Sequence, residues 1–221
     1  MKKNLKVSLL AGMVLLLTVT VSLGGLSLAE AGSVSADDAI ATQDILVQKY
    51  MTASGKITES QILMAEAFGL KEEKEKLESL QAAYASGNVA DKNAIKKQRA
   101  VTDSVNKEIN KKMEEGAELS AESKKLYAKS LVPYSLGVAL FKESVVPEAE
   151  KSVDDAKNVI ANGSLVDKLK LTKKLGTIFY LAPKVVPELK SLLSGASKYI
   201  TYAKKNNITV PKDATDSLGD L

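Results

Sequence analysis

Apolar residues recur at helical spacing along most of the chain. The clearest case is the segment 59–85, whose apolar positions lie seven residues apart: Leu63, Leu70, Leu77 and Tyr84. This period is typical of a helix that buries one narrow apolar face. No segment shows the sustained alternation of apolar and polar residues that a half-buried β-strand needs. The pattern predicts an all-α protein.

The first half of the chain is predicted to form one helix followed by a long antiparallel helical hairpin. We expect the helix over residues 37–52, closed by Ser54-Gly55, and the hairpin over residues 59–115, with its turn at Gly87. The second arm presents four apolar residues to the first: Ile95, Val101, Val105 and Ile109. Charged residues occupy the intervening positions of the first arm, so the apolar face is thin and needs another surface. The candidate interaction face is Leu63, Leu70, Leu77 and Tyr84.

The second half is predicted to form a compact helical bundle with an internal two-fold repeat. Most aromatic residues and four of the five prolines fall between Tyr127 and Tyr202. Two stretches resemble each other, 136–148 and 175–188, and each begins with Leu-Gly and ends with Val-Val-Pro-Glu. Each unit, about forty residues long, is interpreted as an apolar helix, a proline bend and an amphipathic helix. Their apolar helices are expected to cross where Gly137 and Gly176 allow close approach.

The apolar part of each unit is either a core helix or a lipid contact. The run 175–181 carries no charge, and lysines lie on both sides of it. This composition suits a central core helix and also suits insertion at a lipid interface. The candidate residues for core or lipid contact are Phe141, Ile178, Phe179 and Tyr180.

The N-terminus has the three zones of an export signal. Lysines at 2, 3 and 6 precede an apolar run over residues 7–21, and small residues follow. We expect cleavage after Ala29 or Ala31, with an uncleaved membrane anchor as the alternative. The predicted organisation is therefore a signal peptide (1–31), an N-terminal helix and hairpin arm (32–118), a C-terminal bundle (119–207) and a flexible tail (208–221).

Composition removes many classes of chemistry. The chain has no Cys, His or Trp, which excludes cysteine nucleophiles, histidine bases, disulfides and zinc-finger spacings. Neighbouring acidic pairs point in different directions on a helix, and Ser104 with Lys107 matches a Ser-x-x-Lys motif without its companion motifs. Loss of residues 1–31 leaves a net charge of +2 instead of +4, and Arg99 is the single arginine. We expect no catalytic site, cofactor, metal or nucleic-acid partner.

These observations predict an exported, non-enzymatic helical protein of the cell envelope, periplasmic or secreted. It is expected to act by binding another envelope protein or by self-association. The alternative is a helical protein that interacts with lipid or membrane, pore formation included. A small hydrophobic ligand bound between the two repeat units is a third interpretation.

Overall fold

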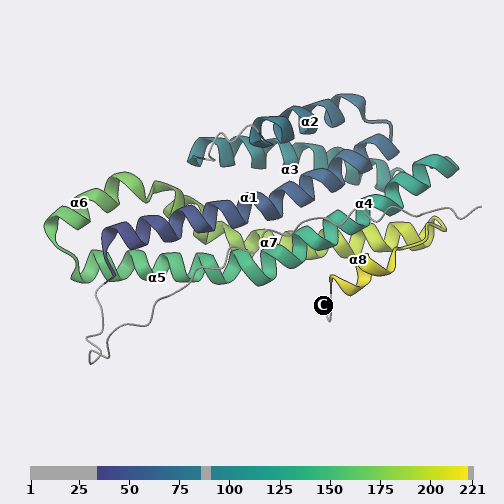
Figure 1. The fold of residues 1–221 in the computed structure, drawn as a ribbon. Helices are drawn as coiled ribbons and strands as arrows, with labels where there is room; N and C mark the ends of the chain where they lie inside the picture. Colours follow the sequence, from purple (N-terminus) through teal and green to yellow (C-terminus); the bar gives the residue numbers. More distant parts are fainter. Residues whose placement is uncertain (1–33, 86–90, 219–221) are drawn as a thin grey trace, which may run out of the picture. The chain divides into compact units, whose positions relative to one another are not determined.

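The computed structural model describes residues 34–85 and 91–218, and the elements within them are all helical (Figure 1). The elements are α1 (Ala36–Ala67), α2 (Lys71–Ala85), α3 (Lys92–Glu114), α4 (Ala121–Leu140), the π-helical turn η1 (Phe141–Val145), α5 (Val146–Asn162), α6 (Leu165–Lys174), α7 (Gly176–Lys205) and α8 (Lys212–Asp216). The predicted all-α class is confirmed. Across these described elements, none combines the length and the apolar character needed to cross a lipid bilayer. The predicted signal peptide and the turn at Gly87 lie outside the described residues.

Helix α1 is longer than predicted because its buried face continues through Gly55. Ser35 begins the helix with a capping box, in which its hydroxyl oxygen accepts a hydrogen bond from the amide of Asp38 at 3.1 Å. One glycine in a helix costs about 1 kcal/mol. Burial of Ile57 and Met64 on the next turns stabilises the helix by roughly 1.5–3 kcal/mol each. The predicted helix end at residues 54–55 is therefore wrong.

The break occurs instead at Gly69, inside the segment predicted as the first hairpin arm. Gly69 has a φ of +69°, and the amide of Leu70 donates to the carbonyl of Ala65 at 2.8 Å. This is a Schellman motif, which needs a residue that tolerates left-handed backbone. The predicted continuous helix over residues 59–85 is wrong, since its first part belongs to α1 and its second part is the separate helix α2; both α1 and α2 pack against α3.

Side-chain caps begin α3 and α6. The Asp91 carboxylate accepts hydrogen bonds from the amides of Asn93 and Ala94 at the start of α3. The Ser164 hydroxyl accepts from the amide of Asp167 at 3.2 Å at the start of α6. Both are side-chain caps that occupy otherwise unpaired amides of a first helical turn.

Pro147 lies in the first turn of α5, as predicted, although no break separates α5 from the helix before it, and Pro187 does not begin a new helix. Helices α4 and α5 are joined without a break by η1, where the amide of Val146 donates to the carbonyl of Phe141, five residues earlier. The wider π turn directly before Pro147 accommodates a residue that has no amide hydrogen to donate. Pro187 lies inside the continuous helix α7. Each predicted unit is thus part of a long helix.

Three long helical segments carry the core: α1, the joined α4 and α5, and α7 (Figure 1). Helix α1 packs most extensively against α4 and runs antiparallel to it, because Thr42 bonds Asp155 while Ile57 contacts Gly137. The side chains form two apolar clusters along this direction. The first cluster contains the first half of α1, with Phe141, Val145 and the first half of α7. The second contains the end of α1, most of α4 and the end of α7.

The crossing predicted for the two repeat units is wrong. A Cβ atom at Gly137 would lie 2.6 Å from Cδ1 of Ile57, so this glycine admits α1 rather than the second unit. A Cβ atom at Gly176 would meet no described atom within 4 Å. The space that Gly137 leaves is filled by a helix from the other half of the chain, which the local resemblance of the two stretches could not indicate.

The segment after residue 207 is also more ordered than the predicted tail. Ile208 and Ala214 are buried in the second cluster, and α8 packs against α4. Asn207 has a φ of 53°, and it ends α7 with the same motif as Gly69 because the amide of Ile208 donates to the carbonyl of Ala203. Both predicted segments, 32–118 and 119–207, contribute helices to one compact unit that begins at Ser33.

Candidate functional site

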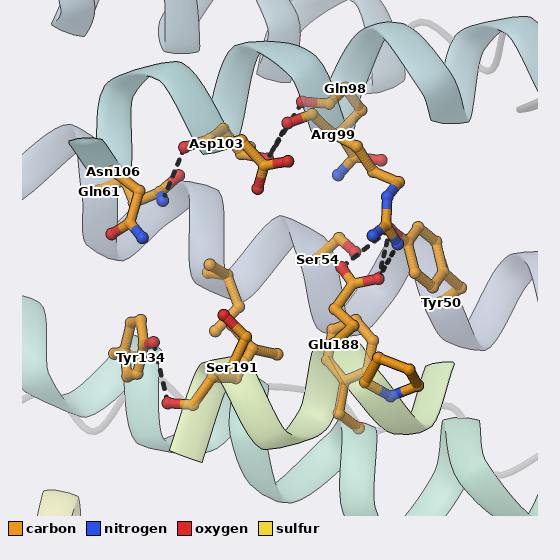
Figure 2. A pocket seen from close by; sticks show the side chains of 15 residues that line it. Tyr50, Ser54, Gln61, Gln98, Arg99, Asp103, Asn106, Tyr134, Glu188 and Ser191 are labelled. Atoms are coloured by element: carbon orange, nitrogen blue, oxygen red, sulfur yellow. Dashed lines mark hydrogen bonds and ion pairs between the residues drawn. The ribbon is translucent and has the colours of Figure 1, made fainter. Parts of the chain in front are cut away.

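A polar cavity of about 250 Å³ lies where the two apolar clusters meet. Figure 2 shows its side chains converging from α1, α3, α4 and α7. It is lined by Tyr50, Ser54, Ile57, Gln61, Gln98, Arg99, Thr102, Asp103, Asn106, Tyr134, Phe141, Pro187, Glu188, Ser191 and Leu192. Most of these residues are polar, although the layers on either side of them are apolar. The cavity is therefore a polar layer inside the bundle.

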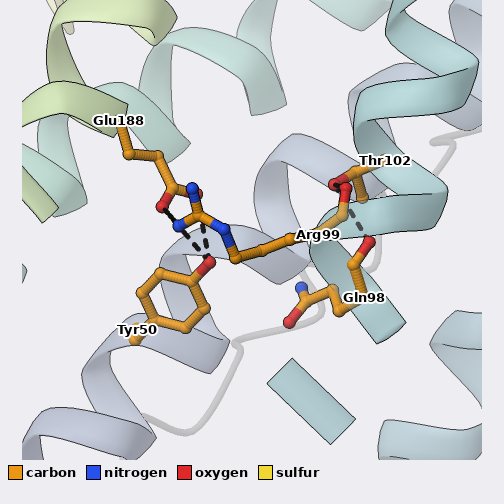
Figure 3. A network of polar contacts seen from close by, with 5 residues as sticks. All are labelled: Tyr50, Gln98, Arg99, Thr102 and Glu188. Atoms are coloured by element: carbon orange, nitrogen blue, oxygen red, sulfur yellow. Dashed lines mark hydrogen bonds and ion pairs between the residues drawn. The ribbon is translucent and has the colours of Figure 1, made fainter. Parts of the chain in front are cut away.

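Arg99 and Glu188 form the ion pair at the centre of the polar contacts (Figure 3). The side chain of Arg99 is 23% exposed and that of Glu188 is 18% exposed. The Tyr50 hydroxyl donates to Oε1 of Glu188 at 3.0 Å. Helices α1, α3 and α7 are thus joined through one carboxylate. Removal of one partner from such a pair leaves a buried charge and costs about 3–5 kcal/mol.

Burial is the largest influence on the pKa values of Glu188, Tyr50 and Arg99. It raises the pKa of the Glu188 carboxyl above its ordinary value of 4.5, although Arg99 and the Tyr50 hydroxyl act in the opposite direction. Burial and the nearby Glu188 charge also raise the pKa of Tyr50, so its hydroxyl keeps its proton. Burial opposes the charge of Arg99, but Glu188 keeps the Arg99 pKa above its ordinary value.

Two amide side chains give the cavity unused hydrogen-bonding capacity. Gln61 is 3% exposed and Gln98 is 2% exposed, and both line the cavity. Among the described residues, neither Oε1 atom has a hydrogen-bond partner. The amide nitrogen of Gln61 donates to the carbonyl of Thr102 at 3.3 Å. The nitrogen of this side chain is therefore paired, and its oxygen is not. A buried acceptor without a partner costs about 1–3 kcal/mol, so a donor that reaches either oxygen would stabilise the protein.

Tyrosine hydroxyl groups fix one wall of the cavity through hydrogen bonds. The Tyr134 hydroxyl donates to the carbonyl of Leu192 at 3.0 Å, and a Cβ atom at Gly195 would lie 2.3 Å from that hydroxyl oxygen. Only a glycine leaves room for Tyr134 against α7 at this position. The Tyr199 hydroxyl donates to Oδ1 of Asn106, which fixes a second cavity residue on α3. The walls are therefore held by hydrogen bonds between helices.

The lining carries one positive and two negative side chains, those of Arg99, Glu188 and Asp103. The cavity is somewhat smaller than the roughly 300–1,000 Å³ of typical ligand pockets, so it suits a small solute or a few water molecules. Its carboxylates do not form a metal site. Over residues 34–85 and 91–218, no three acidic side chains lie close enough together to hold a metal ion.

The four residues predicted as an interaction face lie on different elements. Leu63 is half-buried on α1, and Leu70 is half-buried in the turn after it. Leu77 is fully buried in the second cluster, which contains Val105 and Ile109 of α3 as well. Tyr84 belongs to α2, but its side chain lies outside the part of the chain that is described. The break at Gly69 prevents these positions from forming one continuous stripe.

The four residues predicted for core or lipid contact divide between the core and the surface. Phe141 and Ile178 are buried in the first cluster, and Phe141 packs edge to face on Tyr50 at 5.4 Å. Phe179 is 53% exposed. Tyr180 is half-buried, and Nζ of Lys184 lies 4.5 Å from the centre of its ring. Phe179 is therefore not a core residue.

Sequence reasoning did not identify the cavity, although two signals point to it. Arg99 is the single arginine, and arginine is the residue best suited to a buried ion pair. Gln98 and Thr102 also lie on α3 between the core positions Ile95 and Val105, at the spacing of the buried face. Polar residues at such positions indicate a buried polar contact, whose partners on α1 and α7 depend on long-range packing.

Comparison with protein-family models, with curated proteins and with solved structures gives no match to this chain.

Proposed function

We propose that the protein is an exported, non-enzymatic helical protein that acts by binding, and that its cavity holds a small, positively charged amine. The observation that supports this most directly is the pair of unpaired carbonyl oxygens of Gln61 and Gln98 in the cavity wall. Both are acceptors, so the molecule that pairs with them must supply donors. An ammonium group supplies three.

The charge of the lining favours a cation. Arg99 compensates Glu188, and the further carboxylate of the lining, that of Asp103, belongs to a solvent-exposed residue. The rings of Tyr50 and Phe141 add aromatic surface to the same walls, and such surface attracts ammonium groups. A neutral solute would satisfy the two amide oxygens but would leave the charge unbalanced.

The arrangement supports binding rather than chemistry. Glu188 accepts hydrogen bonds from both Arg99 and Tyr50, so its oxygens are already used within the protein. The high pKa of Tyr50 keeps its hydroxyl protonated as a donor to this carboxylate. These groups are held as a structural network around the space. The proposed ligand is then recognised by the amides on the opposite wall.

Isothermal titration calorimetry on residues 32–221 tests this proposal. The described members of both clusters come from residue 34 onward, so this chain keeps all of them. We expect ethanolamine or ethylenediamine to bind, and glycerol and acetate not to bind. Gln98→Met keeps the side-chain length but removes the acceptor, and should weaken amine binding by about 10- to 100-fold, as expected for loss of a hydrogen bond to a charged donor.

Gln48→Met is the matched control, because Gln48 is exposed on α1 and is not part of the cavity wall. It should leave amine binding unchanged. Absence of binding by both amines, or equal binding by the wild type and the Gln98 variant, would contradict the proposal.

A further inference from the structure

Helix α6 exposes large apolar side chains to an unusual degree. Leu165 is 81% exposed, Val166 is 63% exposed and Leu169 is 67% exposed. Single exposed apolar residues are common on protein surfaces, but three within five residues of one short helix form a patch. Burial of the protein's own core does not explain them.

Neighbouring helices extend this patch. Ile160 near the end of α5 is 47% exposed, and Phe179 in the first turn of α7 is 53% exposed. Both residues lie close to α6 in sequence, and α6 packs against α5 and α7. Together these residues form the α6 patch: Ile160, Leu165, Val166, Leu169 and Phe179.

The charge of this region is positive. The ten residues of α6 contain four lysines and one aspartate. Lys174 is exposed at the end of this helix, and Lys184 on α7 adds positive charge, whereas Lys157 on α5 pairs with Asp154 at 3.5 Å. Apolar side chains framed by lysines are typical of a helix that lies in the interface of a membrane with anionic lipids.

The chain enters the bundle at the same end. Helices α1 and α5 are antiparallel, and Thr42 bonds Asp155 at 2.9 Å. The start of α1 therefore lies near the end of α5, where α6 begins, and α1 is in contact with α6 (Figure 1). The apolar run over residues 7–21 precedes this point of entry.

We propose that the α6 patch docks on the surface of a membrane that contains anionic lipids. A helix of ten residues spans about 15 Å, half the thickness of the hydrocarbon layer, so α6 lies on the membrane rather than across it. The exposed Lys174 contacts the headgroups, and Leu165 and Leu169 enter the boundary between headgroups and acyl chains. This proposal does not depend on the ligand of the cavity.

Vesicle flotation with residues 32–221 tests the docking, since this chain lacks the N-terminal apolar run that would bind lipid by itself. Vesicles of phosphatidylcholine with one third phosphatidylglycerol should carry the protein to the top of the gradient. Vesicles of phosphatidylcholine alone should bind at least tenfold less. Raising the salt concentration should weaken binding to the anionic vesicles.

The variant Leu165→Asp with Leu169→Asp should lower binding to the anionic vesicles at least tenfold while keeping the helical signal and melting temperature of the wild type. Leu136→Asp is the control: Leu136 is 39% exposed on α4, outside the α6 patch, and its variant should float like the wild type. Equal flotation of the double variant and the wild type would overturn the proposal. The proposal would also be overturned if the wild-type protein bound neither kind of vesicle, or if it formed a dimer in solution that covers the α6 patch.

Discussion

Arg99 and Glu188 show how single residues determine the interior of this protein. Each is poorly exposed, and each would be an isolated charge without the other. Three helices meet at this pair through Tyr50, Arg99 and Glu188. The stability of the bundle must therefore depend on the protonation of one carboxyl group.

Replacing Glu188 by Gln should change how stability depends on pH. The pKa of Glu188 in the folded protein is raised above 4.5, its ordinary value, so the folded state holds this proton more tightly than the unfolded state. Stability from this group is fully present below pH 4.5 and is lost as the pH rises through the folded pKa. The Glu188→Gln variant has no carboxyl group at this position, so it lacks this pH-dependent contribution to the free energy of unfolding. Its deficit relative to the wild type should therefore be largest at low pH and become smaller toward pH 7, as measured by urea unfolding at several pH values. A deficit that grows with pH would contradict the direction of this shift.

At the scale of elements, burial rather than local sequence determines where helices continue and end. Gly55, Pro147 and Pro187 are residues that commonly interrupt helices, yet α1, the joined α4 and α5, and α7 run through them. Each helix keeps a buried face on both sides of the residue concerned. Gly69 and Asn207 end helices because the chain reverses there in left-handed backbone.

Helix α7 provides a matched pair of variants for this point. Ile178→Asp places a carboxylate in the first cluster without a partner and should unfold residues 32–221, since such burial costs several kcal/mol. Phe179→Asp, one residue further on the same helix, should change the free energy of unfolding by less than about 1 kcal/mol. Circular dichroism and a thermal melt of both variants measure this difference. Equal stability of the two variants would show that the core does not lie on the Ile178 face.

The sequence predicted the local features of the fold better than the long-range ones. Helical class and the caps at Asp91 and Ser164 follow from residues within one turn of each other, and all three were predictable. The pairing of Gly137 with Ile57 joins positions eighty residues apart, and nothing in either segment specifies the other. The cavity depends on the same kind of pairing, so its polar residues could be noticed but not brought together.

At the scale of the whole molecule, the compact unit begins at Ser33, two residues beyond the predicted export signal. The described members of both clusters come from residue 34 onward, so cleavage after Ala29 or Ala31 would remove none of them. The capping box of Ser35 and Asp38 starts the first helix independently of the residues before it.

Sequencing the N-terminus of the protein recovered from its native host should give a chain that begins at Glu30 or Gly32. The charged, apolar and small-residue zones of residues 1–31 place the cleavage there. An intact Met1 on a membrane-bound protein would contradict cleavage and would favour the anchor.

The polar layer between the two apolar clusters has a consequence for how the bundle opens. A continuous apolar core couples every part of a domain, so one end seldom loosens without the other. Here the side chains of Gln61, Gln98, Arg99 and Glu188 lie between the two ends, and Leu189 and Leu192 of α7 pack against both clusters. Each end can then fluctuate as a cooperative unit of its own. A molecule bound between the two ends would couple them, so that they would open and close together.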